Sequence, residues 1–385
     1  MIRSCNPMQG LIPLTSLGLF LSSRPKLIDV RSPREFSQGS IADSVNLPLL
    51  TDEERHLIGI EYKTKGQQAA LDLGHRLVSG DIKRERISRW NSAVQDQGHC
   101  ALFCARGGLR SQISQDWLST TNPIPRIEGG YKAIRNVLLH EIESALSVLK
   151  SLVVTGTTGS GKTHFLFRFG DDPAIRSIDL ERIAKHRGSA FGDVYGVQPT
   201  QASFENSLGI SLLECRFHFP DSLLLLEDES STIGRVTLPR PFFQKLLALP
   251  MVEIVLPLEQ RVSNIIQDYF EGTRELLPDV EGASHQEKLE NYFLRSLTKM
   301  RKKLGGARFE ALRAKIAAGF QDQGAACSFE PHRVWIRELL QDYYDKYYLN
   351  HIERHRDRIR FSGPPDEVAD WVSSYVENAS SRIVE

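Results

Sequence analysis

The feature that most constrains the fold of this chain is a glycine-rich loop that directly follows a short apolar strand. The segment Ser151-Leu-Val-Val-Thr155 is rich in β-branched residues and runs straight into Gly156-Thr-Thr-Gly-Ser-Gly-Lys-Thr163. A helical pattern begins at Phe165. The strand, loop and helix together match the P-loop motif in the structural context that this motif requires. The sequence therefore predicts an α/β domain with a parallel sheet.

The residues of this loop are the ones that phosphate binding requires. Glycines allow backbone N–H groups to converge on phosphate oxygens at a helix N-terminus. A lysine adds positive charge, and a threonine hydroxyl is a ligand for Mg²⁺. We therefore predict a phosphate-binding site formed by Gly156, Gly159, Gly161, Lys162 and Thr163. Such a loop recognises phosphates and not the group that carries them.

An acidic segment follows another predicted strand of the same domain. The apolar run 221–226 leads into Glu227-Asp-Glu229. Carboxylates at this point normally support Mg²⁺ beside a P-loop. The predicted metal ligands are Thr163 and Asp228, with Glu227 as the substitute for Asp228. The alternative is an acidic turn in solvent.

Composition restricts the class of protein but not its function. A chain of 385 residues exceeds the size of a single core, so two domains are expected. Lysine plus arginine equals aspartate plus glutamate, at 48 each, so net charge does not indicate a nucleic-acid partner. The five cysteines form no Cys-x-x-Cys pair, which argues against a disulfide framework and favours a reducing cytoplasm. No apolar run reaches the roughly 18 residues of a membrane span.

A second candidate site centres on a cysteine between a predicted strand and a predicted helix. Cys104 follows the buried strand 101–103 and begins a Cys-x5-Arg-Ser segment. The N–H groups of such a turn, the helix dipole and Arg106 or Arg110 would stabilise a thiolate, the nucleophilic form of cysteine. The predicted catalytic residues are therefore Cys104, Arg106 and Arg110. The alternative is a small, buried, apolar cysteine.

Motifs around both sites resemble known families. The segments 27–36 (Leu-Ile-Asp-Val-Arg-Ser-Pro-Arg-Glu-Phe) and 44–48 (Ser-Val-Asn-Leu-Pro) resemble the opening signature of rhodanese domains. Glu128-Gly-Gly-Tyr131 resembles their closing glycine turn, whereas the stretch 51–99 is longer than a minimal rhodanese domain needs. A rhodanese-like domain followed by this P-loop and by Glu227-Asp-Glu-Ser230 resembles the tRNA 2-selenouridine synthase family.

The order of these signals predicts the organisation of the chain. We expect a rhodanese-like parallel-sheet domain, a P-loop NTPase-like α/β domain and a helical, basic C-terminal region. The predicted segments are an N-terminal extension (1–25), the rhodanese-like domain (26–132), a connecting helix (133–150), the P-loop domain (151–260) and the helical basic region (261–385).

Two basic clusters in the last region indicate an RNA surface. The first runs from 295 to 315 with Glu310 as its only acidic residue, the second from 351 to 360, and four tyrosines lie between them. Basic groups neutralise phosphates, and aromatic faces stack on unpaired bases. The predicted RNA contacts are Arg301, Lys302, Lys303 and Arg308. A solvated helical face with buried tyrosines is the alternative.

The family resemblance implies a selenotransferase that acts on tRNA and also has geranyltransferase activity. It implies that 2-thiouridine at the wobble position becomes 2-selenouridine through an S-geranyl intermediate. The substrates would be selenophosphate and geranyl diphosphate, with Mg²⁺ as a possible ion and no tightly bound cofactor. The ligand of the P-loop, geranyl diphosphate or a nucleotide, stays open, as does the oligomeric state.

Two other functions remain open at this stage. Cys-x5-Arg is also the spacing with which cysteine phosphatases enclose a phosphate. An inactive rhodanese module that regulates a P-loop NTPase or kinase is the other alternative.

Overall fold

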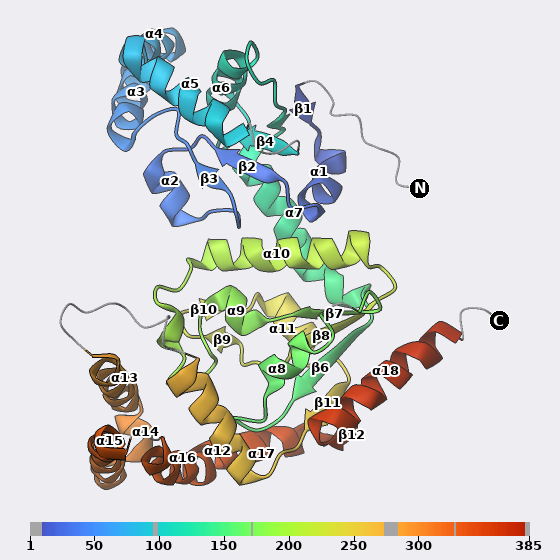
Figure 1. Ribbon diagram of the computed structural model, residues 1–385. Coiled ribbons are helices and arrows are strands. Elements are labelled where there is room, and N and C mark those ends of the chain that lie inside the picture. The colour runs from blue at the N-terminus through green and yellow to red at the C-terminus, as the bar shows by residue number, and fades with distance from the viewer. Residues whose placement is uncertain (1–9, 95–98, 171, 273–283, 327–328, 382–385) are drawn as a thin grey trace. The chain divides into compact units, whose positions relative to one another are not determined.

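Two compact units make up the chain in the computed structural model, which describes residues 10–94, 99–170, 172–272, 284–326 and 329–381. The first unit contains the residues up to Ala145 together with Thr200–His218. The second contains Leu146–Pro199 and Phe219–Glu385. Each unit has a five-stranded parallel sheet (Figure 1), as the α/β pattern predicted. Cys5 and Cys327 lie outside the described residues.

The sheet of the first unit has the strand order β1-β5-β4-β2-β3, and all neighbouring strands are parallel. Along its central strands successive side chains point to opposite faces. Leu27 and Phe103 join one hydrophobic cluster, whereas Ile28 and Leu102 join the other. Both faces are therefore buried. The strands are β1 Leu11–Ile12, β2 Lys26–Asp29, β3 Val45–Asn46, β4 Cys100–Phe103 and β5 Arg126–Ile127.

Helices cover both faces of this sheet. Side chains of α1, α7 and α10 complete one cluster, and side chains of α5 and α6 contribute to the other. At the start of α2 the backbone N–H of Ser32, the N-cap, donates to Glu35 Oε2 at 3.1 Å. The helices named here are α1 Leu14–Ser22, α2 Pro33–Gln38, α5 Gly80–Val94, α6 Leu109–Leu118, α7 Gly130–Ser144 and α10 Gln201–His218.

The first unit begins earlier than the predicted boundary at residue 26. Residues 11–22, which were assigned to an N-terminal extension, form β1 and α1. β1 pairs with β5 at the edge of the sheet. Leu17 and Leu21, four residues apart on one helix face, are buried in the core of the unit. Their burial explains why this apolar segment belongs to the domain.

Helix α10 also differs in its assignment, because it lies in the stretch 151–260 of the predicted P-loop domain yet packs in the first unit. Ile210 and Leu213 of α10 join the cluster that contains Leu138 of α7. Gly209 permits a close approach, since a Cβ atom there would lie 2.8 Å from the Cβ of Leu138. The first unit therefore takes one helix from the middle of the chain.

Three helices occupy the long stretch 51–99 of the first unit. They are α3 Asp52–Lys65, α4 Gln67–Leu77 and α5. α3 begins with a capping box in which the backbone N–H of Glu54 donates to Thr51 Oγ1 at 3.2 Å. Gly66 ends α3 with a φ of +88°, and the chain turns back so that α4 packs on α3 (Figure 1). The insertion is thus a helical addition to the sheet.

The P-loop strand lies in the centre of the second sheet, whose order is β12-β11-β6-β8-β7 with all pairs parallel. The carboxyl ends of neighbouring parallel strands form the crevice where ligands bind in such sheets. The strands are β6 Ser151–Thr155, β7 Ile175–Ile178, β8 Leu223–Glu227, β11 Met251–Ile254 and β12 Ile359–Gly363. The helices among them are α8 Lys162–Phe167, α9 Leu180–Ala184 and α11 Arg240–Leu246. β9 Thr232–Ile233 and β10 Val236–Thr237 form a separate antiparallel pair.

The C-terminal region is mainly helical, as predicted, but it also returns to the sheet. β12 lies inside the segment 261–385 and pairs with β11. Its Ile359 and Phe361 are more buried than the intervening Arg360. An aromatic core that includes Phe293 and Trp335 joins the helices. These are α12 Leu258–Ile266, α13 His285–Lys299, α14 Arg301–Leu304, α15 Gly306–Ala326, α16 Arg333–Leu339 and α17 Asp345–Arg354. The last helix, α18 Pro365–Ser381, packs on the core of the sheet through Val368 and Val372. No helix in the described part of the chain is long and apolar enough to cross a membrane.

Candidate functional site

A glycine turn holds the loop that carries Cys104. β4 ends at Phe103, so Cys104 lies at the carboxyl end of a central strand. Its carbonyl oxygen accepts a hydrogen bond from the N–H of Tyr131 at 2.8 Å. Gly130 has a φ of +57°, and a Cβ atom on it would lie only 2.2 Å from the same carbonyl oxygen. Only glycine allows the turn to come this close to the loop.

The Cys104 thiol lies at the N-terminus of α6. The residue is 3% exposed, and its Sγ donates to Ser111 Oγ at 3.3 Å. Ser111 Oγ in turn donates to the carbonyl oxygen of Gly108, the N-cap of α6, at 2.9 Å. The helix dipole favours negative charge at this end. The sulfur therefore lies where an anion at the loop would face the positive end of α6, and the catalytic role of Cys104 stays a prediction.

The two predicted arginines of this loop take different positions. Arg110 donates to both carboxylate oxygens of Glu35, at 2.6 and 3.0 Å, and Arg55 lies 3.1 Å from the same carboxylate. Burial would raise the pKa of Glu35, but the hydrogen bonds and charge of Arg110 hold this pKa at about 2. Arg106 is exposed and forms no ion pair with any residue that the structure describes. Arg106 is therefore available to an anion, whereas Arg110 braces the loop through Glu35.

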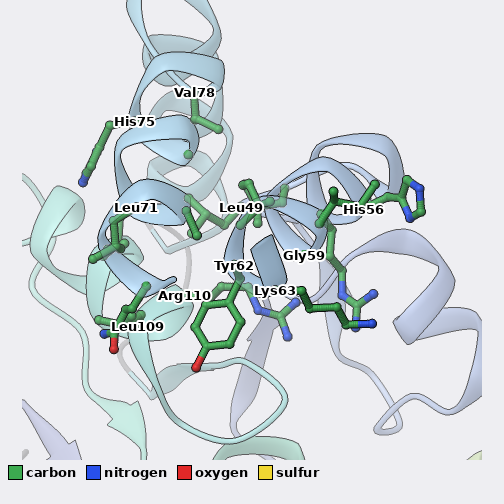
Figure 2. A pocket seen from close by; sticks show the side chains of 18 of the residues that line it. Leu49, His56, Gly59, Tyr62, Lys63, Leu71, His75, Val78, Leu109 and Arg110 are labelled. Atoms are coloured by element: carbon green, nitrogen blue, oxygen red, sulfur yellow. The ribbon is translucent and has the colours of Figure 1, made fainter. Parts of the chain in front are cut away.

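A large pocket opens beside the cysteine loop. Its volume is about 970 Å³, and its walls come mainly from α3, α4 and α6 (Figure 2). Arg106, Leu109 and Arg110 line it, so the loop and the first turn of α6 form part of its wall. The sequence alone does not predict this pocket, because the pocket arises from the way the inserted helices pack.

The P-loop has the backbone conformation that its glycines predict. Gly156, Gly159 and Gly161 have φ values of 151°, 80° and 81°. A Cβ atom on Gly156 would lie 2.7 Å from the carbonyl oxygen of Ile254, so the loop passes close to β11. Lys162 Nζ donates to the carbonyl oxygen of Gly156 at 3.0 Å and so lies across the loop. The loop geometry is suited to phosphate, and the identity of its ligand stays a prediction.

The two metal candidates make different contacts. Thr163 Oγ1 donates to Glu227 Oε1 at 2.8 Å. The other oxygen of Glu227 is buried and has no hydrogen-bond partner among the described residues. Asp228 instead accepts a hydrogen bond from Thr155 Oγ1 at 2.6 Å and pairs with His351 Nε2 at 3.1 Å. The geometry therefore favours Glu227 over Asp228 as the partner of Thr163.

Carboxylates crowd the P-loop cavity, which has a volume of about 120 Å³. Asp179, Glu181 and Glu229 line it together with Lys162. Burial raises the pKa of Glu227 and of Glu229 well above the ordinary value, and the charge of Glu181 raises both further. A bound cation would relieve this repulsion.

The same residues fit a Mg²⁺ ion that binds together with a phosphate. In the described ranges, no three His, Cys, Asp or Glu side chains are arranged to hold a metal by themselves. The unpartnered oxygen of Glu227 and the hydroxyl of Thr163 are hard oxygen ligands, and Mg²⁺ usually completes its shell with substrate phosphates and water. When bound, Mg²⁺ would neutralise phosphate charge at this end of the sheet.

Comparison with known proteins covers nearly the whole chain. The family model of the tRNA 2-selenouridine synthase AAA domain matches residues 149–379, and the rhodanese-like domain model matches residues 19–136. A tRNA 2-selenouridine synthase from Shewanella frigidimarina (strain NCIMB 400) is 39% identical over 96% of this chain and 100% of its own length. The enzyme of that name from Pseudomonas fluorescens (strain Pf0-1) is 41% identical over 92% of this chain and 95% of its own. This chain belongs to the tRNA 2-selenouridine synthase family.

Membership of the tRNA 2-selenouridine synthase family confirms the predicted pairing of domains. The rhodanese-like model spans the Cys104 loop, and the AAA model spans the P-loop. The AAA model also extends over β12 and most of α18. The C-terminal helices thus belong with the P-loop unit, as their contacts indicate.

Acidic residues distant in sequence neutralise part of the first basic cluster. Lys299 pairs with Asp193 at 2.7 Å, and Arg308 pairs with Asp342 at 2.6 Å. In the sequence only Glu310 lies among these cations, because the other acidic partners come from distant elements. Arg308, a predicted RNA contact, therefore already forms an ion pair within the protein.

The remaining predicted RNA contacts lie on the short helix α14. Arg301, Lys302 and Lys303 are exposed. Neither of the two lysines forms an ion pair with a described residue. Among the tyrosines, Tyr344 is buried in the aromatic core and Tyr347 is 72% exposed. RNA binding by α14 stays a prediction. The burial of Tyr344 agrees with the alternative in which the tyrosines are buried, but only at that position.

Several residues of the P-loop site had no signal in the sequence. Tyr348 places its ring 5.4 Å from Lys162 Nζ, and Arg187 lines the same cavity. His351, which was assigned only to a basic cluster, contacts Asp228. Each residue reaches the site through long-range packing, and only a contact map or the structure could have found it.

Proposed function

We propose that this protein converts 2-thiouridine at the wobble position of tRNA into 2-selenouridine, with selenophosphate as the selenium donor and geranyl diphosphate as the activating co-substrate. The observation that carries the proposal is the presence of both sites in one chain that aligns over 96% of its length with a tRNA 2-selenouridine synthase. The protein would then be a selenotransferase with geranyltransferase activity.

The chemistry begins with activation of the sulfur atom. A thiocarbonyl sulfur is a poor leaving group. The sulfur of 2-thiouridine attacks C1 of the geranyl group, an S–C bond forms, and the C–O bond to diphosphate breaks. Diphosphate leaves with the electron pair, and the base loses its N3 proton. C2 of the S-geranyl base is electrophilic, because its sulfur can now depart as a thiolate.

Selenium then replaces the geranylated sulfur. The selenium of selenophosphate attacks C2, and the C2–S bond breaks to release geranyl thiol after protonation by water. Hydrolysis of the Se–P bond releases phosphate and leaves 2-selenouridine. We assign Cys104 to this half of the reaction as a covalent nucleophile: in that route its thiolate attacks C2 and releases geranyl thiol, and selenium then attacks C2 and displaces the Cys104 sulfur as a thiolate. Arg106 and the loop N–H groups would bind the anionic donor, because Arg106 is exposed and without an ion-pair partner in the described chain.

The P-loop supplies the phosphate-binding half of the proposal. Lys162 and the loop N–H groups would hold a phosphate-bearing ligand, with Thr163 and Glu227 as the residues for an accompanying Mg²⁺. The exposed cations of α14 would contact the tRNA backbone. The Cys-x5-Arg phosphatase gains no support, since Arg110 is engaged by Glu35.

The test is a reconstitution in which each substrate is omitted in turn. The protein is incubated with three substrates: geranyl diphosphate, selenophosphate and a tRNA that contains 2-thiouridine. The tRNA is then digested, and its nucleosides are identified by mass spectrometry. All three together should give 2-selenouridine, and omission of selenophosphate should leave the S-geranyl nucleoside. If neither product forms with all substrates present, the proposal is wrong.

Cys104→Ala tests the selenium step separately. It should lower 2-selenouridine formation at least about a hundredfold while S-geranylation continues. Cys100→Ala is the matched control, since Cys100 is also buried, in the strand that leads to the loop, but has no role in the proposal. Full selenation by the Cys104→Ala protein would overturn the assignment.

A further inference from the structure

The pocket beside the cysteine loop has walls that suit a hydrocarbon. Its lining includes Ile58 from α3, Leu71 from α4, and Ile113 and Trp117 from α6. Its volume of about 970 Å³ lies within the range of small-molecule sites, roughly 300 to 1,000 Å³. Apolar walls around so large a space favour a ligand that buries a carbon chain.

The charge around this pocket is of one sign. Arg55, Lys63, Arg106 and Arg110 line it, and no described lining residue carries a carboxylate. Glu35, which is not among the lining residues, neutralises part of the charge of Arg55 and Arg110. Lys63 and Arg106 have no ion-pair partner among the described residues. An anionic group at this rim would therefore gain two cations without breaking an existing pair.

Figure 2 shows how the polar and apolar parts are arranged. Tyr62 and Lys63 come from the last turn of α3, and the side chain of Arg110 extends from α6 toward them. Leu71 belongs to α4, and Val78 directly follows the last residue of this helix. The ligand that matches both parts is an amphiphile with an anionic group at one end and a carbon chain at the other.

The pocket shares residues with the loop that carries Cys104. Arg106 belongs to that loop, and Leu109 lies one residue beyond the Gly108 N-cap of α6. A chain seated against Leu109 would place its polar end near the loop where the selenium step is proposed.

We propose that this pocket binds the ten-carbon isoprenoid chain of the geranyl substrate, with its anionic neighbour at Lys63, beside the Arg106 that the proposed function assigns to selenophosphate. The inference rests on the proposed function for the identity of the isoprenoid. The chain can arrive on free geranyl diphosphate or on the S-geranyl base of tRNA, where an RNA phosphate supplies the negative charge. Both sources present the same chemistry to the pocket.

Gly59 offers a way to fill the pocket without disturbing the core. It lies in α3 and lines the pocket, and a Cβ atom added there would meet no atom within 4 Å. Gly59→Phe should therefore occupy the space intended for the chain. Gly59→Ala is the matched control, because it changes the same position but adds only a methyl group. Leu71→Gln is an independent variant that keeps the size of the wall and makes it polar.

The measurement is photoaffinity labelling of the full-length protein. The probe is geranyl diphosphate with a diazirine on its terminal isoprene unit, and labelled peptides are located by mass spectrometry. Wild type and Gly59→Ala should be labelled within residues 49–78 or 109–117. Labelling of Gly59→Phe and Leu71→Gln at these residues should be at least about tenfold weaker than labelling of wild type. One extra or missing methylene group in an apolar pocket already changes discrimination between ligands by about this factor. Circular dichroism confirms that the variants are folded.

Competition then separates the two sources of the chain. An anticodon stem-loop with S-geranyl-2-thiouridine that removes the label at lower concentration than the 2-thiouridine stem-loop supports binding of the RNA-linked chain. Removal by unlabelled geranyl diphosphate alone supports binding of the free donor. Label confined to the P-loop unit, or equal labelling of wild type and Gly59→Phe, would overturn the assignment of this pocket to the isoprenoid chain.

The reconstitution described above is run in parallel with the labelling. Product formation with label outside the pocket contradicts this inference and leaves the proposed function standing. Label inside the pocket without any modified nucleoside contradicts the proposed function and supports the site as an isoprenoid pocket.

Discussion

Substitution of Glu35 by glutamine should loosen the cysteine loop by removing one charge. Glu35 accepts two hydrogen bonds from Arg110 and lies 3.1 Å from Arg55. Its carboxylate also accepts a bond from the backbone N–H of Ser32 at the start of α2. Glutamine keeps the size of the side chain and one carbonyl acceptor, so the change isolates the ionic part of these contacts.

The size of the effect follows from the pKa of Glu35. Burial would raise this pKa, yet Arg110 holds it at about 2 instead of the ordinary 4.5. That difference corresponds to about 3 kcal/mol between the charged and neutral carboxyl. The side chains of Arg110 and Glu35 are 22% and 16% exposed, so solvent screens part of the interaction. We expect a loss of about 1 to 2 kcal/mol at neutral pH.

The pH dependence has a definite sign. A carboxyl whose pKa is lowered by folding stabilises the native state above its unfolded pKa and loses this contribution as the pH falls through the folded pKa. The difference between wild type and Glu35→Gln should therefore be largest at neutral pH. It should shrink as the pH falls below 4.5 toward about 2.

Hydrogen exchange followed by mass spectrometry measures this effect in the full chain. Peptides that cover α2 and the start of α6 should exchange about five- to thirtyfold faster in Glu35→Gln at neutral pH. Glu61→Gln is the control, because Glu61 pairs at 3.0 Å with Lys65, whose side chain is 66% exposed. It should change protection by less than about 0.5 kcal/mol. Equal small effects of both variants, or a Glu35 effect that grows on acidification, would refute the reasoning.

Two further predictions concern a glycine turn and a histidine. Gly130→Ala should destabilise the first unit by about 2 to 4 kcal/mol and abolish selenation, because its Cβ would lie 2.2 Å from the Cys104 carbonyl oxygen at a φ of +57°. Thermal unfolding and nucleoside analysis check this, and Gly306→Ala, where an added Cβ meets no atom within 4 Å, should change neither. The hydrogen bond to Asp228 raises the pKa of His351 in the folded protein. The contact therefore stabilises the fold fully below the unfolded pKa of about 6.5, and this contribution is lost as the pH rises through the pKa of the folded state. The melting temperature of His351→Gln should thus lie below that of wild type in mildly acidic buffer and match it at alkaline pH, whereas a deficit confined to alkaline pH would contradict this account.

Local motifs determined both candidate sites from the sequence alone. The P-loop and the Cys104 loop each depend on a strand, a short turn and a helix that are contiguous in the chain. Their glycines can be recognised because they permit backbone conformations that other residues avoid, as at Gly159 and Gly130. The predicted central strands and the α/β class were confirmed for the same reason, since a buried apolar run is visible within a few residues.

Contacts between distant segments were decided only by the tertiary structure. α10 joins the first unit through Ile210 and Leu213, and β12 returns to the second sheet. The local sequence of neither segment indicates which element it packs against. Asp193 and Asp342 neutralise cations that look unpaired in the sequence. The large pocket exists because α3 packs against α4 and α6, and packing is a property of surfaces that meet in space, not of neighbours along the chain.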